Sequence, residues 1–433
     1  MIFKRIQLGL IHVAVAMTLV PINSTLNRVM IKDLGISATL VAVLASLPYL
    51  ISPIQVAIGS FADRHAVFGL QRTPYIALGL LLCVTGVILS PYAAFLIVDD
   101  FWIGLVVGLI AFGSWGMGYN LSAVSYMSLA SEISGEKGRS RTIAIMFTMM
   151  IVGIILTSIA LSNMVDPYSP QALISAFRVI GLIALVLGML GLVRLENRHA
   201  RNDLPASDNY TWAEMLHQVA GNRQVKTFFI YLIILLAAIL GQDILLEPFA
   251  AEAFAMTVQS TTRITSIWGT CFLVAMVIAG MLEGRVQKLT LARLGGWNAL
   301  VGFVLIAASG LLSSPAIFYT GLVVLGIGTG LSTVSNLSLM LDMTTAGKVG
   351  LYIGIWGMAN AISRLLGSLI GGVLRDTLTY MFQDPVVAYV TVFTGMALLM
   401  LISLWILSRI DVSLFRKQSE SQLGVLERAT LVD

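Results

Sequence analysis

Residues 116–132 read GMGYNLSAVSYMSLASE, and residues 326–342 read GIGTGLSTVSNLSLMLD. A weaker echo joins GSFADR at 59–64 to GMLEGR at 280–285. Both pairs occupy equivalent places in the two halves of the chain, so we expect the halves to be structural repeats. At the constant offset of the longer pair, identical residues stand at Gly116, Gly118, Leu121, Ser122, Val124, Ser125, Ser128 and Leu129, and Glu132 meets Asp342.

The composition is that of a membrane protein. Of the 433 residues, 58% are hydrophobic and 11% are charged, with a mean hydropathy of +0.91. An ordinary soluble domain carries about 25% charged residues, so a soluble domain and a disordered chain are excluded. The formal net charge is +4 without a basic stripe, which excludes a nucleic-acid binder. Cys83 and Cys271 lie inside apolar runs, where neither a disulfide framework nor a metal site is expected.

Apolar runs of membrane-spanning length recur along the chain. About 20 apolar residues in a helix cross the core of a bilayer. The run that follows Lys4 and Arg5 exceeds this length without a small-x-small cleavage site, which predicts a retained first helix. Ser313-Ser314-Pro315 divides the longest run into two. We therefore predict twelve membrane helices, over residues 6–27, 34–62, 73–98, 101–131, 142–165, 179–193, 227–251, 264–282, 294–341 as two helices, 349–376 and 386–408.

Lysine and arginine are distributed unevenly between alternate loops. With the N-terminus in the cytoplasm, most of them fall in cytoplasmic segments, which predicts that both termini are cytoplasmic. Residues 1–194 and 224–408 then form two six-helix bundles, joined by a cytoplasmic linker at 195–223 and followed by a cytoplasmic tail at 409–433. In the linker, Thr211 to Glu214 fits a capping box and predicts a short amphipathic helix on the membrane surface, with partner docking as the functional alternative.

Two six-helix halves in parallel repeat resemble the major facilitator superfamily, which implies an all-α polytopic fold. The loop after the second helix strengthens this resemblance, because Gly59, Asp63, Arg64 and Arg72 are similar to the superfamily's signature at that place. There the signature latches the two halves on the cytoplasmic side, and the resemblance implies the same role here. Ordinary charged loop residues are the alternative reading. The other members of the expected latch are Glu132, Arg139 and Arg141.

Polar residues gather where the first and seventh helices end. Asp243 and Glu247 are four residues apart and share a helix face, and Pro248 is expected to weaken the helix just beyond them. Because these helices are neighbours across the pseudo-twofold, we predict that Arg28 pairs with Asp243 or Glu247; solvated outer-loop charges are the alternative. The full predicted cluster is Asn23, Asn27, Arg28, Gln242, Asp243, Glu247, Pro248 and Glu252.

Longer strings carry a more specific resemblance. LNRVMIKDLG at 26–35, QDILLEPFAAEAFAMTV at 242–258 and SEISGEKGRSRTIAIMFTMMIVGII at 131–155 resemble the PucC/LhaA family, the bacteriochlorophyll-delivery branch of the superfamily. The resemblance implies a factor that handles (bacterio)chlorophyll while light-harvesting antenna or reaction-centre complexes are assembled in a bacterial cytoplasmic or photosynthetic intracytoplasmic membrane. It implies as partners the polypeptides of those complexes and pigment-synthesis proteins. His65-Ala66 departs from the common loop signature, which puts conventional alternating transport in doubt.

A chlorophyll pigment needs one axial ligand for its magnesium and apolar walls for its ring. His12 is the histidine inside an expected helix and is the first candidate ligand. Asn120, Gln242 and Asn336 are further candidate ligands, and packing within the helices is the alternative for each. Tryptophans could flank the ring, although such residues more often serve as packing or interface anchors. The candidate ring contacts are Trp115, Trp268, Trp297 and Trp356.

Enzyme chemistry is not indicated by the sequence. No nucleophile elbow, HExxH pair, phosphate-binding loop or dinucleotide fingerprint is found, so we expect neither an enzyme nor a nucleotide site. The Gly-rich runs GSWGMG and GIGTG lie inside expected membrane helices, where small residues permit close packing. The alternative to a pigment-handling assembly factor is a proton-coupled transporter of a small organic solute.

Overall fold

The computed structural model describes residues 2–52, 69–196, 223–282, 284–342 and 349–410, with positions 54, 58, 61, 65 and 67, and leaves aside the side chains of 136–137, 139–140, 341 and 349–353. Eleven helices among these residues are long and apolar enough to cross a membrane. Of the predicted second span, the described part comprises α2 (Ala38–Ala45) and α3 (Leu47–Leu50). The predicted linker helix and most of the signature loop lie outside the described residues.

Most predicted spans are continuous helices in the structure. The predicted division at Ser313-Ser314-Pro315 is confirmed, because α12 ends at Leu311 and α13 begins at Pro315. The fourth and fifth spans run together as α6, which changes direction at Gly135, where φ is 61°. The helices are α5 (Thr73–Asp99), α6 (Phe101–Met164), α7 (Pro170–Leu192), α11 (Val258–Leu282), α12 (Lys288–Leu311), α13 (Pro315–Asp342), α14 (Val349–Phe382) and α15 (Pro385–Leu407).

The first and seventh spans are irregular. The first comprises α1 (Ile2–Met17) and two π-helical turns, η1 (Pro21–Leu26) and η2 (Val29–Asp33). The seventh comprises α9 (Arg223–Gly241), the 3-10 turn η3 (Gln242–Ile244) and α10 (Leu246–Phe254). The predicted position of the weak point is therefore wrong, since the break precedes Pro248. Proline cannot bond the carbonyl four residues back and clashes with it, and that carbonyl belongs to Ile244, inside η3.

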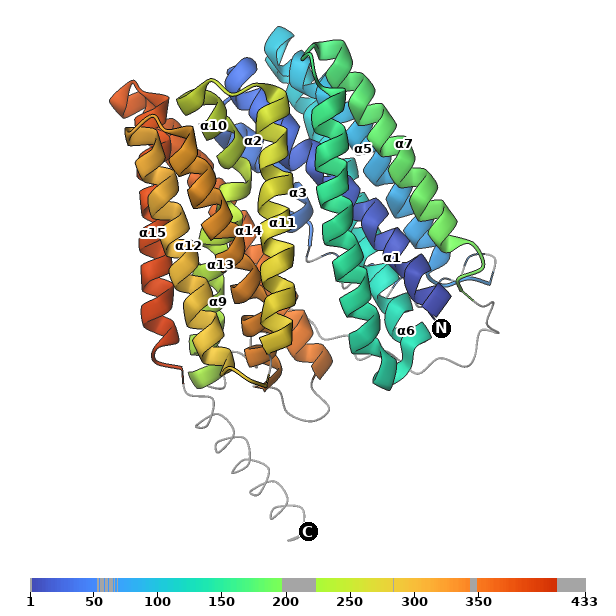
Figure 1. The fold of residues 1–433 in the computed structure, drawn as a ribbon. Coiled ribbons are helices and arrows are strands. Elements are labelled where there is room, and N and C mark those ends of the chain that lie inside the picture. Colours follow the sequence, from blue (N-terminus) through green and yellow to red (C-terminus); the bar gives the residue numbers. More distant parts are fainter. Residues whose placement is uncertain are drawn as a thin grey trace.

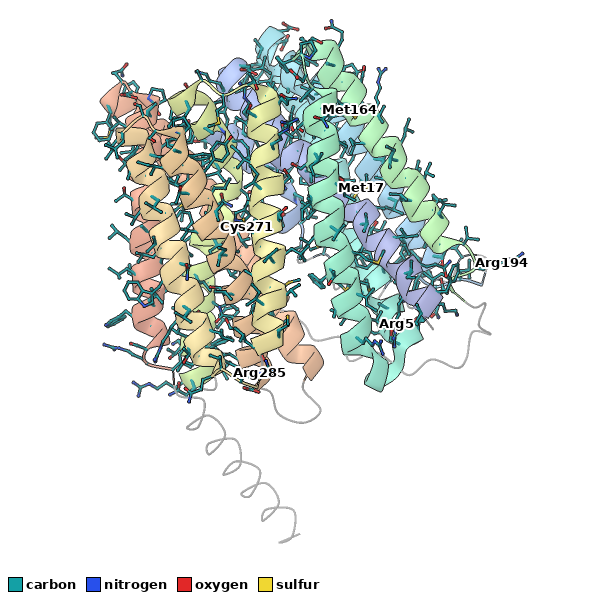
Figure 2. The ribbon with its side chains drawn as sticks, viewed as in Figure 1. Arg5, Met17, Met164, Arg194, Cys271 and Arg285 are labelled. Atoms are coloured by element: carbon teal, nitrogen blue, oxygen red, sulfur yellow. The ribbon has the colours of Figure 1, made fainter. Side chains whose placement is uncertain are left out.

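The helices form two bundles. Figure 1 shows α1, α5, α6 and α7 gathered in one and α9 to α15 in the other. The bundle end that holds α10, at the top of Figure 1, is called the α10 end below, and the opposite end, which holds the first residues of α1, is called the N-terminal end. Figure 2 shows Arg5, Arg194 and Arg285 at the N-terminal end, as the distribution of basic residues predicts for one face of the membrane.

Close helix contacts repeat between the bundles at matching positions. A Cβ on Gly118 in α6 would lie 2.4 Å from the carbonyl oxygen of Gly79 in α5. In the second bundle, a Cβ on Gly328 in α13 would lie 2.8 Å from the carbonyl oxygen of Gly295 in α12. Gly118 and Gly328 are aligned in the sequence repeat, so the repeat is a repeat of helix packing in which small residues let two backbones approach.

An ion pair repeats in the same way at the N-terminal end. Arg72, just before α5, contacts Glu132 of α6 with an N–O distance of 3.0 Å. Lys288, at the start of α12, contacts Asp342 at the end of α13 at 2.9 Å. Glu132 and Asp342 are the acidic residues that end the two aligned stretches. The predicted equivalence of these two positions is therefore confirmed by their partners.

The close contact at Gly118 predicts a sharp difference between two glycines of α6. Gly118→Ala should lower the free energy of unfolding by about 1–3 kcal/mol, the usual cost of overpacking a tight core. Gly113→Ala is the control, because a Cβ at Gly113 meets no atom within 4 Å. Thermal unfolding of both variants in the same detergent would measure the difference. Equal stabilities would contradict the packing described here.

Candidate functional site

An ion pair lies within the membrane-spanning part of the second bundle. Arg364, near the middle of α14, bonds through Nη1 to Oδ2 of Asp243 in η3. Gln242 donates from Nε2 to Oδ1 of the same carboxylate at 2.9 Å. The Arg364 guanidinium also lies over the ring of Tyr49, in α3 of the first bundle, 5.3 Å from the ring centroid. The pair therefore contacts the other bundle and is not directed at lipid.

Two glycines bring these charges together. A Cβ on Gly367 of α14 would lie 2.3 Å from the carbonyl oxygen of Ala237, so α9 and α14 are in backbone contact there. Gly241 meets Gly367 from the other helix, with its Cβ position 2.9 Å from the Gly367 backbone. Arg364 lies three residues before Gly367, and Asp243 lies two residues after Gly241. The turn η3 then places Asp243 beside α14.

Both charged side chains keep part of their surface open. The exposed fractions are 25% for Arg364 and 22% for Asp243. Charges within a membrane helix are costly unless they are paired or face a polar space, and this pair meets the first condition. The arrangement offers a ligand the guanidinium N–H groups that Asp243 does not occupy, a carboxylate and an aromatic face at the boundary between the bundles. It can therefore hold a polar or charged group of a bound molecule.

The predicted pairing of Arg28 is wrong. Arg28 bonds Asp33 within its own span, and its Nη2 donates to the carbonyl oxygen of Met256 at 3.2 Å. The reason is the π-helical turn η2, in which residues five apart are brought together. The prediction assumed α-helical spacing and so overlooked Asp33. Asp243 finds its cation on the eleventh span instead of the first, because the glycine contact brings α9 against α14.

The first and seventh spans nevertheless meet, as predicted. Lys32 bonds Glu252 of α10 with an N–O distance of 2.5 Å. The Arg28 bond to Met256 joins the same two spans. Asn27 and Asn23 do not reach across, since Asn27 donates from Nδ2 to the carbonyl oxygen of Asn23 one turn earlier. The predicted contact between the first and seventh spans therefore exists, but its charged residues pair with other partners than those predicted.

A further acidic residue joins the bundles at the α10 end. Asp376 of α14 accepts hydrogen bonds from the backbone N–H groups of Ala38 and Thr39, at 3.1 and 2.7 Å, and from the Thr39 hydroxyl at 2.7 Å. It therefore caps α2, a helix of the other half, where a carboxylate suits the helix dipole. Sequence reasoning missed Asp376, because caps are sought among residues adjacent in the chain.

Helix α11 adds further hydrogen bonds between the bundles. Thr262 contacts Thr25 of η1, hydroxyl to hydroxyl, at 2.9 Å. Its carbonyl oxygen accepts from the Ser158 hydroxyl of α6 at 2.7 Å. Arg263 donates to Asn163 Oδ1 at 2.9 Å. Together with the Asp376 cap and the Lys32 pair, these bonds hold the bundles together in the part of the membrane near the α10 end.

Glu247 is a buried carboxyl group whose surroundings offer no free cation among the described residues. It is 4% exposed, accepts from the Thr265 hydroxyl at 2.8 Å through Oε1, and has an Oε2 that meets no partner in the described chain. Four basic side chains on the neighbouring spans pair with other acids: Arg364 with Asp243, Arg28 with Asp33, Lys32 with Glu252 and Arg375 with Asp376. Arg263 of α11 donates to Asn163 instead.

Part of the predicted signature loop can be placed. Arg72 pairs with Glu132, as given above, inside the first bundle. Glu196, which the prediction omitted, accepts bonds from the backbone N–H groups of Gln71, Arg72 and Thr73 and so caps α5. Arg141 is exposed. Gly59, Asp63, Arg64 and the side chain of Arg139 lie outside the described residues, and their role as a latch stays a prediction.

The candidate pigment contacts differ in how their polar atoms are satisfied. Trp115 is fully buried and donates from Nε1 to the Thr18 hydroxyl at 3.1 Å. Asn120 donates from Nδ2 to the carbonyl oxygens of Pro48 and Gly116 at 2.8 and 2.9 Å. Asn336 accepts from the Tyr231 hydroxyl at 2.9 Å. These three side chains therefore stabilise helix contacts, and in Asn336 the amide oxygen that would bind magnesium already accepts a hydrogen bond.

His12 and two tryptophans retain unused polar or aromatic surface. His12 is 5% exposed, its Nδ1 has no partner in the described chain, and its ring lies 5.1 Å from the rings of both Tyr126 and Phe147. Trp268 stacks on Phe272 at 5.4 Å with a buried Nε1 that has no partner among the described residues. Trp356 is half-buried, and Trp297 is half-exposed. Among the candidate ligands, His12 and Gln242 each keep a buried atom without a partner in the described structure, Nδ1 of His12 and Oε1 of Gln242.

Comparison with known families identifies the chain's relatives. The family model described as PUCC protein matches residues 25–415. The chain belongs to the PucC family. It is 28% identical over 418 residues to Protein PucC of Rhodobacter capsulatus, covering 93% of this chain and 90% of the relative. It is also 27% identical over 406 residues, 92% of each chain, to a Rhodobacter capsulatus protein named bacteriochlorophyll synthase 44.5 kDa chain.

Solved structures show the fold of this PucC-family chain. A point mutant of the nucleoside transporter NupG superposes with a TM-score of 0.74, 14% identity and coverage of 94% of this chain and 99% of that one. A D-xylose-proton symporter superposes with a TM-score of 0.68 at 14% identity, with coverage of 92% of this chain and 97% of the symporter chain. The fold is that of the major facilitator superfamily, with two repeated bundles, as the sequence repeat predicts.

The Asp243–Arg364 pair predicts coupled mutational effects. Removing one partner of a fully buried pair costs about 3–5 kcal/mol; because this pair is partly exposed, Asp243→Asn and Arg364→Gln should each cost on the order of 2–3 kcal/mol. The double variant should lose less than the sum, since it leaves no unpaired charge. The free energies of unfolding of the wild type and the three variants, measured by chemical or thermal unfolding, complete a double-mutant cycle. Additive losses would show that the two residues act separately.

Glu247 predicts the opposite response to loss of charge. Glu247→Gln keeps the shape and an oxygen acceptor for Thr265, and it removes a charge that has no cation beside it in the described chain. The unfolding free energy should change by less than about 1 kcal/mol, well below the penalty for breaking a buried pair. The comparison is made beside Asp243→Asn in the same unfolding assay. A loss as large as that of Asp243→Asn would reveal a counter-ion for Glu247 outside the described residues.

Proposed function

We propose that this protein is an assembly factor that binds (bacterio)chlorophyll and delivers it to light-harvesting antenna or reaction-centre polypeptides. Its membership of the PucC family over residues 25–415 carries the proposal. The name of one relative, bacteriochlorophyll synthase 44.5 kDa chain, supports a link to this pigment. The expected partners are those polypeptides and pigment-synthesis proteins. The expected location is a bacterial cytoplasmic or photosynthetic intracytoplasmic membrane, with both termini on the cytoplasmic side.

The cargo would need an axial ligand for its magnesium, and His12 fits that need best. A neutral imidazole nitrogen is a common metal ligand, and His12 has a buried Nδ1 without a partner in the described chain. Phe147, which is 40% exposed, makes an edge-to-face contact with the imidazole and would turn aside to admit a macrocycle. In this proposal His12 holds the pigment, while the ring of Tyr126 packs beside the imidazole.

The central ion pair would serve the polar rim of the same cargo. Arg364 lies at the boundary between the bundles with part of its guanidinium accessible. Guanidinium N–H groups donate to carbonyl and carboxylate oxygens, and such oxygens are carried on the edge of chlorophyll macrocycles. Asp243 would keep the Arg364 guanidinium oriented while no cargo is bound. None of these roles makes or breaks a covalent bond, so we infer a carrier and not an enzyme.

A proton-coupled transporter of a small organic solute is the second candidate. It is favoured by the fold shared with the D-xylose-proton symporter, which concerns architecture alone. It is also favoured by a partly exposed ion pair at the boundary between two bundles, where secondary transporters bind their substrates. The two candidates differ in what accompanies the protein, a tightly held pigment or a freely exchanging solute.

The proposal predicts a pigment that depends on His12. Protein purified in mild detergent from a phototroph should carry (bacterio)chlorophyll absorption near one pigment per chain. His12→Leu should reduce the pigment per chain by about ten-fold or more, the scale on which loss of one buried ligand interaction acts. His65→Leu is the control, because His65 is exposed. Trace pigment in the wild type, together with gradient-driven solute uptake into vesicles, would overturn the proposal in favour of the transporter.

A further inference from the structure

A groove opens on the outside of the second bundle at the N-terminal end. It has a volume of about 430 Å³ and lies between the first turns of α9 and the last turns of α15. Its walls are Arg223, Gln224, Thr227 and Ile230 from α9, and Trp405, Ile406 and Arg409 from α15 and the residues after it. Trp405 is 57% exposed, and Ile230 is also exposed. Large exposed apolar side chains on membrane helices face lipid, so the groove opens toward the bilayer.

The groove is amphipathic along its length. Arg223 is the first residue of α9 and Arg409 follows the end of α15, so both cations stand at its membrane-surface end. Ile230 lies two turns further into the membrane than Arg223, and Trp405 lies one turn further in than Arg409. A groove that is cationic at the interface and apolar beneath it has the profile of a phospholipid, with a head group above an acyl chain.

The two arginines carry charge that no acid of the described chain neutralises. Neither side chain takes part in an ion pair there, unlike Arg72, Arg364 and Arg375. The Arg409 guanidinium stacks on the Trp405 ring with its carbon 3.8 Å from the centroid. Stacking fixes the plane of the guanidinium and leaves its N–H groups at the edge free to donate. That is the geometry in which arginine binds the oxygens of a phosphate.

We propose that this groove binds the phosphate group of an anionic phospholipid. Arg223 and Arg409 donate to the phosphate oxygens, and Trp405, Ile230 and Ile406 line the path of an acyl chain. Basic pockets between membrane helices at the bilayer surface recognise anionic head groups in this way. This site is separate from the one proposed for the pigment, so either proposal can fail without the other.

Lipid retention tests the proposal directly. Full-length protein stripped of lipid would be titrated with phosphatidylglycerol or phosphatidylcholine, and bound lipid counted by native mass spectrometry. Each surface arginine contributes about 1 kcal/mol to anionic-lipid binding, so the double variant R223Q/R409Q should bind phosphatidylglycerol roughly 30-fold more weakly. Arg293→Gln is the matched control, an exposed arginine near the start of α12 at the same end of the bundle.

Three outcomes of the titration would overturn the proposal, and a truncated variant supplies a fourth test. The first is unchanged binding of phosphatidylglycerol by R223Q/R409Q, and the second is equal affinity for phosphatidylcholine. The third is full competition by soluble glycerol phosphate at the lipid's own concentration, which would point to a free phosphate ester as the ligand. A variant lacking residues 411–433 guards against occupation by the tail, because the tail follows Arg409 closely. The proposal requires that this variant keep its preference for phosphatidylglycerol and its sensitivity to R223Q/R409Q.

Discussion

A charge inside a membrane is costly unless the protein supplies a partner for it, and the partnership of Asp243 with Arg364 organises the second bundle. Asp243 and Arg364 meet because α9 and α14 touch at Gly241 and Gly367, and because η3 interrupts the seventh span beside that contact. A larger residue at either glycine would separate the helices and leave both charges without a partner. The helix break before Pro248 and the close contact between Gly241 and Gly367 therefore act together, because both are needed to bring Asp243 and Arg364 within bonding distance.

The bonds between the bundles make the two ends of the molecule different. Near the α10 end, Lys32, Asp376 and Thr262 each link one bundle to the other. At the N-terminal end, the pairs made by Arg72 and Lys288 each stay within one bundle and join consecutive helices of the repeat. Among the described residues, the repeated pairs thus join helices within each bundle at that end, and the hydrogen bonds and ion pairs between bundles named above lie toward the other.

The sequence was sufficient to predict the parts of the fold that follow from the length of apolar runs, from polar breaks between them and from the internal repeat. Apolar length predicted the spans, the Ser313-Ser314-Pro315 break predicted the boundary between α12 and α13, and the repeat predicted the paired contacts at Gly118 and Gly328. The pairing of charges could not be read in this way. It depends on π-helical spacing at Arg28 and on which helices touch, and neither is encoded in local hydropathy. Arg364 was visible as a charge within an apolar span, and matching it to Asp243 required the fold.

The cap on α2 has a consequence for how the chain is made. The backbone N–H groups of Ala38 and Thr39 are bonded by Asp376, a residue that is synthesised more than three hundred positions later. When only the first bundle has been synthesised and inserted, the N–H groups of Ala38 and Thr39 have water as their hydrogen-bond partner at the membrane surface. The second membrane helix thus reaches its final state only when the eleventh has been inserted, so completion of the first half is timed by arrival of the second.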